Sequence, residues 1–173
     1  MTTLALPAAR TGHRAAPRVL DAKRLGDHID RLYRAALGLT GSPADAEDLV
    51  QDVYVRVLAK PRLVTGADDL GYLLRVLRNT FISGRRTAAR RPSTATAPED
   101  LERFQGRRSD PVHAFEARQL YASIAELPDH QRDALVAVDL LGLSYKEAAD
   151  SLKVPTGTIM SRLFRARQAL ATA

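Results

Sequence analysis

Four side chains near the C-terminus have the chemistry to read the edges of DNA bases: Ser161, Phe164, Arg165 and Gln168. Arginine can bridge O6 and N7 of guanine, serine and glutamine hydrogen-bond to base edges, and an aromatic ring packs on thymine methyl groups or sugars. On a helix of 3.6 residues per turn these four share one side. An apolar stripe with core-facing spacing takes the other side: Ile159, Leu163, Ala166 and Leu170. The sequence therefore predicts a helix with one buried face and one face that another molecule covers.

The residues around this helix suit the DNA backbone. Thr156 and Thr158 place hydroxyl and N–H groups at the helix N-terminus, which favours phosphate, and Arg162 lies on the flank. Upstream, the sequence SYKE from Ser144 to Glu147 is a capping box that opens a shorter helix, and a tight break follows at residues 153–155. This order is typical of a helix-turn-helix. The alternative is a surface helix that carries a few arginines and an exposed phenylalanine without function.

Charge is distributed unevenly along the 173 residues. Lysine and arginine number 26 against 20 acids, and the pI near 10.0 indicates a polyanionic partner. Residues 70–96 contain six arginines and no acid, whereas residues 42–52 contain four acids and no base. Because a uniformly solvated surface mixes its charges, this segregation predicts two basic surfaces and one acidic surface with different partners.

The elements that position these residues are all expected to be helical, because no long segment alternates apolar and polar residues. Helical spacing or capping signals predict helices over about 25–40, 43–59, 68–86, 112–126, 129–141 and 145–152, before the C-terminal helix. Between them, residues 92–110 are rich in small residues, proline and mixed charge, which is typical of a flexible linker. We therefore expect an all-α protein with two small helical domains, 21–91 and 111–173, preceded by a disordered arm over residues 1–20.

Several function classes are disfavoured by composition. There is no cysteine, and the four histidines are scattered over different segments: His13, His28, His113 and His130. We therefore expect no metal site, no cofactor and no catalytic residues. No apolar run approaches the roughly 20 residues that cross a bilayer, and the N-terminus has the wrong order of charge and apolar residues for a secretory signal. A cytoplasmic protein without membrane insertion is the expectation.

From about Leu25 onward the chain resembles the extracytoplasmic-function (ECF) class of bacterial sigma-70-family factors. Three segments carry the resemblance: DAEDLVQDVYVRVL (45–58), YLLRVLRNTFISGRRTAARRP (72–92) and the stretch from LPDHQRDAL to RARQAL (127–170). They are similar to conserved regions 2 and 4 of that family, in the same order. The resemblance implies a promoter-specificity subunit that binds core RNA polymerase and promoter DNA, leaves catalysis to the polymerase, and in many members is held by an anti-sigma factor.

The resemblance assigns a partner to the acidic helix. In the family this helix docks on the clamp coiled coil of the polymerase β′ subunit, while region 4 meets the β flap. The matching positions here are Asp45, Glu47, Asp48, Gln51 and Asp52. The alternative is a solvated helix whose acids only oppose the helix dipole, each contributing a few tenths of a kcal/mol to about 1 kcal/mol. A metal site built from these carboxylates is a further, weaker alternative.

The resemblance implies that the arginine-rich helix captures a base of the melted −10 element, together with the loop over residues 63–70. The matching or suitably charged residues are Tyr72, Arg75, Arg78, Asn79, Arg85 and Arg86. Core packing is the favoured alternative for Tyr72 and Phe81. The resemblance assigns recognition of the −35 element to the C-terminal helix and its N-terminus, with these residues: Thr156, Thr158, Ser161, Arg162, Phe164, Arg165 and Gln168.

Two residues depart from the family pattern. Tyr72 stands where a tryptophan is usual, and Met160 stands where a basic residue often precedes the SR pair. Met160 weakens any promoter sequence inferred from relatives. A different class of function also remains open, namely a stand-alone helix-turn-helix regulator whose first domain serves dimerisation or effector binding.

Overall fold

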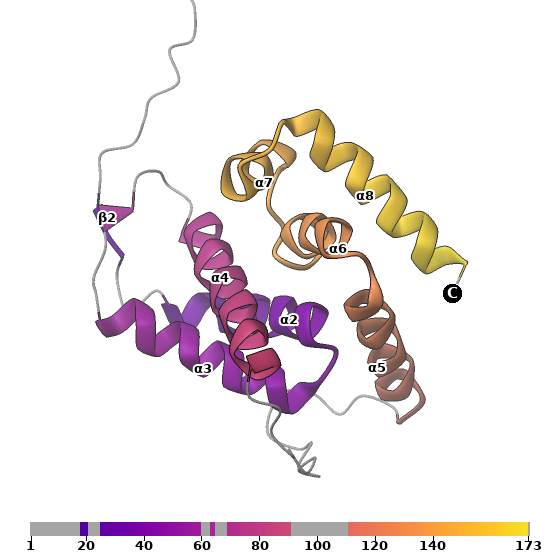
Figure 1. Ribbon diagram of the computed structural model, residues 1–173, viewed down its shortest axis with the longest axis horizontal. Helices are drawn as coiled ribbons and strands as arrows, with labels where there is room; N and C mark the ends of the chain where they lie inside the picture. The colour runs from indigo at the N-terminus through magenta and orange to yellow at the C-terminus, as the bar shows by residue number, and fades with distance from the viewer. Residues whose placement is uncertain (1–17, 21–24, 60–62, 65–68, 91–110, 173) are drawn as a thin grey trace, which may run out of the picture.

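The computed structural model describes residues 18–20, 25–59, 63–64, 69–90 and 111–172, and these are helical apart from one short β-pairing (Figure 1). The first half contains β1 (Arg18–Val19), η1 (Gly26–His28), α2 (Ile29–Thr40), α3 (Pro43–Ala59), β2 (Leu63–Val64) and α4 (Asp69–Arg90). The second half contains α5 (Pro111–Glu126), α6 (Asp129–Leu135), the π-helical turn η2 (Val136–Leu140), α7 (Tyr145–Leu152) and α8 (Thr156–Ala171). The all-α expectation is therefore confirmed.

The junction between α2 and α3 follows the turn chemistry of the sequence. Gly41 ends α2 in the left-handed conformation, with φ 71°, and its N–H donates to the carbonyl of Leu37. Ser42 then accepts a hydrogen bond from the N–H of Asp45 at 3.4 Å, and Pro43 is the first residue of α3. A side chain at position 41 would be strained by this φ and would also place its Cβ 2.8 Å from that of Ala125.

A small β-pairing joins the start of the described chain to the segment before α4. Arg18 pairs with Val64 and Val19 with Leu63 in antiparallel fashion, and Leu20 is buried next to them. Ordered structure therefore begins inside the segment predicted as a disordered arm, and part of the loop expected over 63–70 is a strand. Two other predicted segments, residues 1–17 of the arm and the linker over 92–110, lie outside the described residues.

The helix expected over 129–141 is interrupted by a wider turn. The N–H of Leu141 donates to the carbonyl of Val136 at 3.0 Å, so α6 stops at Leu135 and a π-type turn continues to Leu140. Such a turn inserts one residue without changing the apolar character of the segment, so helical spacing alone did not reveal it. Gly142 then closes the element with φ 75°.

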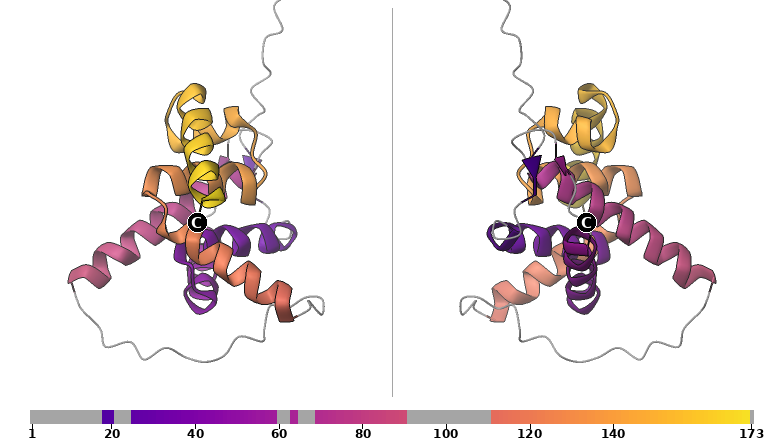
Figure 2. Two further views of the ribbon diagram at one scale, coloured as in Figure 1. Left: turned by 90° about the vertical axis from the view of Figure 1, so that its right-hand side faces the viewer. Right: turned by 90° about the vertical axis from the view of Figure 1, so that its left-hand side faces the viewer.

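The two halves pack against each other along α2. One apolar core contains Leu32, Leu39 and Leu77 from the first half together with Val136 and Ile159 from the second. The close approach depends on Gly38, because a Cβ there would lie 2.5 Å from Leu140 Cδ1 and 3.2 Å from Val136 Cγ2. Figure 2 shows the C-terminal end of α4 and the N-terminal end of α5 projecting on opposite sides of this shared core.

The capping box of α7 gives a direct test of the local fold. The Ser144 side chain accepts from the N–H of Glu147, and the Glu147 carboxylate accepts from the Ser144 N–H at 2.8 Å. We expect Ser144→Ala to lower the free energy of unfolding by about 1 kcal/mol, measured by urea denaturation. Ser83→Ala, at an exposed position within α4, is the matched control and is expected to be neutral or slightly stabilising. Equal effects of the two variants would contradict a capping role.

Candidate nucleic-acid interface

The helix-turn-helix is formed by α7, a left-handed Lys153 (φ 56°) and α8. Ile159, Leu163 and Ala166 anchor α8 and are at most 2% exposed. On the other side Phe164 is 68% exposed and Met160 is 52% exposed. Because burying such side chains is favourable, two large apolar groups left in water on one helix face mark a surface for contact with another molecule.

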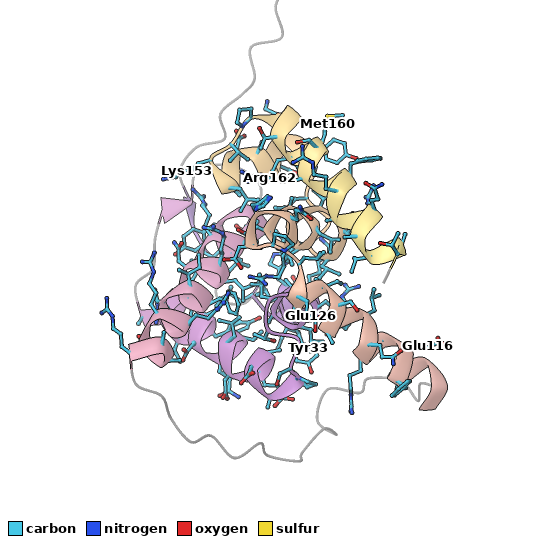
Figure 3. All side chains as sticks on the ribbon, turned by 45° about the vertical axis from the view of Figure 1, so that its right-hand side comes forward. Tyr33, Glu116, Glu126, Lys153, Met160 and Arg162 are labelled. Atoms are coloured by element: carbon cyan, nitrogen blue, oxygen red, sulfur yellow. The ribbon has the colours of Figure 1, made fainter. Side chains whose placement is uncertain are left out.

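The predicted −35 residues lie on and around this exposed face. Ser161, Arg165 and Gln168 are exposed, and the Ser161 hydroxyl donates to the carbonyl of Thr158 at 3.1 Å. Thr156 is exposed at the N-terminus of α8, where Pro155 provides no side-chain cap, so the first-turn N–H groups have no capping side chain. Thr158 and Arg162 are half-buried. Figure 3 shows Met160 and Arg162 leaving α8 on different sides.

A paired arginine holds α8 in place. Arg167 donates to both carboxylate oxygens of Asp139 in η2, at 2.7 and 3.1 Å. The hydrogen bonds from this pair raise the pKa of Arg167. Arg167 therefore fixes the recognition helix to its own domain, although its sequence position also suits a phosphate contact.

The six residues predicted for the −10 element divide into two groups on α4. Tyr72, Arg75, Asn79 and Arg86 fall within an arc of about 60° on the helix. Of these, Arg75, Asn79 and Arg86 are exposed, whereas Tyr72 is half-buried and packs on the core.

The other two residues of this set, Arg78 and Arg85, lie on a different flank of α4 and face α6. Their guanidinium groups bond Asp133 at 2.6 Å and Asp129 at 3.3 Å. Neither aspartate was identified from the sequence, because nothing local links them to α4.

The acidic helix presents most of its predicted residues to solvent. Asp45, Asp48, Gln51 and Asp52 are exposed, whereas Glu47 is half-buried. Glu47 turns toward Tyr33 of α2, whose pKa is raised first by burial and then by this carboxylate.

The exposed face of α3 is also partly apolar. Val55 is 67% exposed and Leu58 is 52% exposed. Neither was among the residues that the sequence assigned to this face, which were all polar. Together with Asp48 and Asp52 they give the face the mixed character of a protein interface.

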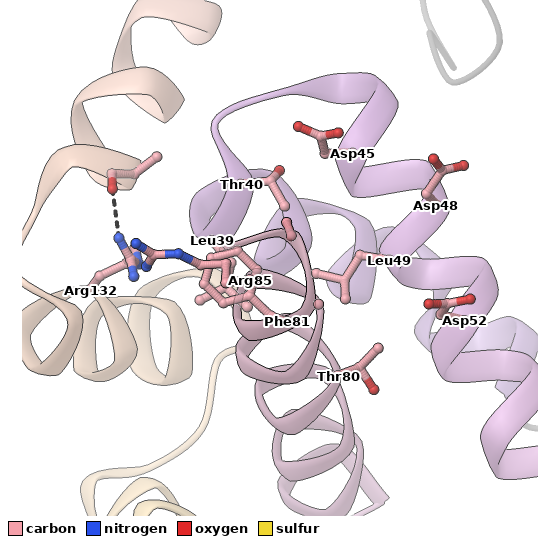
Figure 4. Close-up of a pocket in the computed structure, with 13 residues that line it drawn as sticks. Leu39, Thr40, Asp45, Asp48, Leu49, Asp52, Thr80, Phe81, Arg85 and Arg132 are labelled. Carbon is pink, nitrogen blue, oxygen red and sulfur yellow. Dashed lines mark hydrogen bonds between the residues drawn. The ribbon is translucent and has the colours of Figure 1, made fainter. Parts of the chain in front are cut away.

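A cavity of about 510 Å³ lies where the two halves meet (Figure 4). Asp45, Asp48 and Asp52 line it along α3, while Phe81 and Arg85 come from α4. Two buried polar atoms at its wall, Thr80 Oγ1 and Arg132 Nε, have no hydrogen-bond partner within the described part of the chain. The seam between the halves is therefore incompletely packed.

Over the same described residues, no group of three or more histidine, cysteine, aspartate or glutamate side chains is arranged to hold a metal ion. None of the described helices is long and apolar enough to cross a membrane.

The fold and these surfaces define a two-part helical protein with a C-terminal helix-turn-helix. Residues 25–91 match the model of Sigma-70 region 2, and residues 117–170 match that of Sigma-70 region 4. The chain thus belongs to the sigma-70 family, whose members are transcription initiation factors of RNA polymerase.

Individual relatives show that the chain belongs to the ECF class of this family. The chain is 35% identical over 147 residues to the ECF RNA polymerase sigma factor SigE of Mycolicibacterium smegmatis, covering 83% of this chain but only 57% of SigE. It is 32% identical to SigM of Bacillus subtilis over 83% of this chain and 88% of SigM.

A solved structure shares the arrangement of helices. The sigma factor RpoE of Bartonella quintana, determined in complex with the anti-sigma factor NepR, superposes with a TM-score of 0.64 at 26% identity. The match covers 87% of this chain and 95% of RpoE.

Proposed function

We propose that this sigma factor directs core RNA polymerase to promoters through three surfaces on two domains, 21–91 and 111–173, connected by residues 92–110. In this proposal α3 binds the polymerase, α8 reads the −35 duplex, and the outer face of α4 holds the melted −10 strand. The observation that carries the proposal is the pairing, in one chain, of an acidic exposed α3 with a helix-turn-helix whose second helix, α8, contains no acid and exposes Phe164 to water.

The α3 surface has the chemistry of a docking site for a basic partner. Asp48 and Asp52 are four residues apart on one side of the helix, and Val55 and Leu58 extend that side toward the C-terminus of α3. The acids orient the partner and raise the rate of association, and the exposed apolar side chains add apolar area that the partner buries. The β′ clamp coiled coil is the polymerase element we assign to this face, with the β flap assigned to the second domain.

The outer face of α4 has the chemistry to retain a single strand. Arg75 and Arg86 attract phosphates, and Asn79 between them can hydrogen-bond to an unstacked base. Such contacts favour the open state of the promoter because they are made only after the bases leave the stack.

Other partners follow from this role. The complex of Bartonella quintana RpoE with NepR supports an anti-sigma factor as a regulator of this chain as well. Catalysis is left to the polymerase, no cofactor is required, and the protein acts in the cytoplasm together with the polymerase.

Transcription in vitro tests the proposed function. Purified chain and core polymerase are combined with a supercoiled genomic library, and we expect promoter-dependent transcripts and co-purification with core. A chain that binds duplex DNA but neither binds core nor yields such transcripts would instead be a stand-alone regulator.

The α4 surface makes a separate prediction about salt. Arg75→Gln with Arg86→Gln is expected to reduce the slope of log affinity against log salt, for a single-stranded oligonucleotide, by about 1.4, because each lost phosphate contact removes about 0.7. Fluorescence anisotropy over a salt series measures the slope. Arg31→Gln with Arg118→Gln removes the same charge from exposed positions on other helices and is the matched control. An equal reduction of the salt slope by both double variants would show that the strand binds to another surface.

A further inference from the structure

The cavity of about 510 Å³ between the two halves has an acidic wall, which consists of Asp45, Asp48 and Asp52 of α3. Their spacing places the three side chains within an arc of about 60° on the helix (Figure 4). Over the described residues, none of the three carboxylates forms an ion pair. Because carboxylates on one helix face repel one another, a cation placed between them is attracted by all three.

A basic wall, which consists of Arg85 of α4 and Arg132 of α6, lines the same cavity. Figure 4 shows Arg132 on the side of Phe81 that lies away from the acids. The two guanidinium groups are 5.7 Å and 5.5 Å from the centre of the Phe81 ring. Both arginines also donate to Asp129, so two positive charges meet one negative charge and this wall stays cationic. The cavity is therefore negative on one side and positive on the other.

Two buried polar groups of the cavity lack a hydrogen-bond partner among the described residues. Thr80 and Arg132 are each 4% exposed, and the atoms concerned are Thr80 Oγ1 and Arg132 Nε. The Nη atoms of Arg132 already donate to the carbonyls of Ala125 and Leu127 and to Asp129. A buried donor without an acceptor is unfavourable, so a ligand that accepts from the Nε–H gains more than an exposed contact would give.

The space between the two walls is bordered by apolar groups and by a small residue of α4. Leu39, Leu49 and Phe81 supply the apolar surface. Gly84 leaves room, because a Cβ built there would meet no atom within 4 Å. A second cavity, of about 410 Å³, shares four lining residues with the first, Asp52 and Gly84 among them. A hollow of this size between two domains, with few polar groups in an apolar lining, is typical of a small-molecule site.

We propose that this cavity binds a small zwitterion, namely an aliphatic amine with a carboxylate at its far end. The ammonium group lies between Asp52 and the Thr80 hydroxyl, the stem packs on Phe81, and the carboxylate accepts from Arg132 Nε. A simple cation would use only the acidic wall, and a simple anion would use only the basic wall. The compound with both charges is the one that meets both walls and both unpartnered atoms.

The ligand uses carboxylates that the polymerase would also use, and this consequence rests on the role proposed above for α3. An ammonium group held by Asp48 and Asp52 cancels part of the negative charge of that helix. A basic partner is then attracted less strongly. Ligand and core polymerase therefore weaken each other's binding, each by the same factor.

NMR titrations of the isotope-labelled full-length chain test the site directly. The probes are straight-chain amino carboxylates from γ-aminobutanoate to ω-aminooctanoate, with the alkylamine and the alkanoate of matching length. We expect saturable shifts at the amides of Asp52, Thr80 and Gly84. The best amino carboxylate should bind about tenfold more tightly than its alkylamine, because its carboxylate adds a charge-assisted hydrogen bond. The alkanoate should bind most weakly, because the acidic wall repels it.

Two single variants disturb the site by different means. Gly84→Leu is expected to weaken binding about tenfold or more, since ligand and side chain cannot occupy one volume, and leucine suits the helix better than glycine. Thr80→Val removes the unpartnered hydroxyl at nearly constant shape. We expect it to keep or raise the thermal stability of the free protein and still to weaken binding about three- to tenfold. A hydroxyl that serves only the fold would show the reverse, with lower stability and unchanged binding.

Each change has a matched control. Ala89→Leu adds a leucine at an exposed position of α4 that lines neither cavity, and it should leave binding unchanged. Asp45→Asn with Asp52→Asn should weaken binding about tenfold, because charge-assisted contacts are lost. Asp27→Asn with Asp30→Asn removes the same charge from exposed positions outside the cavity and should have little effect.

The outcomes separate the site from the proposed function. The absence of saturable shifts with every amino carboxylate overturns the site, as does equal weakening by the two leucine variants. An alkylamine that binds as tightly as its amino carboxylate overturns the zwitterion. Saturating ligand should lower affinity for core about fivefold or more in the unmodified chain but not in Gly84→Leu, and an unchanged affinity overturns the competition. If α3 does not bind polymerase, its charge reversal leaves core binding intact while the titration still shows the ligand site.

Discussion

Replacing two acids of α3, Asp48→Arg with Asp52→Arg, is expected to weaken binding to core RNA polymerase by about 100-fold or more. Both side chains are exposed and lie one helical turn apart, so the substitutions turn an acidic face into a basic one. Truncating one partner of a charge pair that becomes buried and hydrogen-bonded in an interface typically costs about 2–5 kcal/mol, and reversal adds repulsion. A loss of about 2.7 kcal/mol already corresponds to 100-fold.

The fold should tolerate this change. Neither residue is buried, and neither lies in the first turn of α3, where a positive charge would oppose the helix dipole. Binding to core is measured by fluorescence anisotropy of labelled sigma factor, and thermal unfolding verifies the fold. Asp27→Arg with Asp30→Arg changes the same charge in the same domain at exposed positions off α3, and is expected to retain binding within about threefold.

A second readout makes the result specific to the polymerase contact. Binding of the second domain to its −35 duplex uses α8 and should survive the reversal. If core binding also survives, α3 is a solvated helix whose acids only oppose the helix dipole. If both activities are lost together, the substitutions have disturbed the whole molecule.

Local signals predicted most helix ends correctly. Gly41 and Pro43 set the end of α2 and the start of α3, and Ser144 with Glu147 marked the first turn of α7. Each of these signals acts within four residues, through a backbone conformation or a cap that the residue type itself favours. The buried stripe of α8 is equally local, because helical spacing alone separates Ile159 from Phe164.

Interactions between distant segments were not predictable in this way. Helical spacing placed Arg78 and Arg85 on α4 but did not indicate that Asp133 and Asp129 would face them, because the pairing depends on how the two domains dock. The π-type turn at Val136 was missed for a related reason, since it leaves the apolar character unchanged and shifts Leu140 toward Gly38.

The recognition helix gives the second large effect. Arg165 is exposed between Ser161 and Gln168 on α8, where a guanidinium can donate to O6 and N7 of one guanine. We expect Arg165→Ala to weaken binding to the preferred −35 duplex by about 1–3 kcal/mol, or roughly 5- to 150-fold. Because the side chain is exposed, the thermal stability should not change.

The pattern of the loss decides between two roles for Arg165. Duplexes selected by the unmodified chain from a randomised pool define the preferred sequence, and the variant is then measured on every single-base change. A base contact predicts relaxed specificity at one position, whereas a phosphate contact predicts the same loss on every sequence and a smaller salt slope. Arg118→Ala, an exposed arginine on α5, carries the same change in charge and should alter neither the base specificity nor the salt slope.

Phe164→Ala should lower affinity for duplexes whose site contains a thymine, because the thymine methyl group loses the ring that packs on it. The stability of the fold should change little, because Phe164 is 68% exposed.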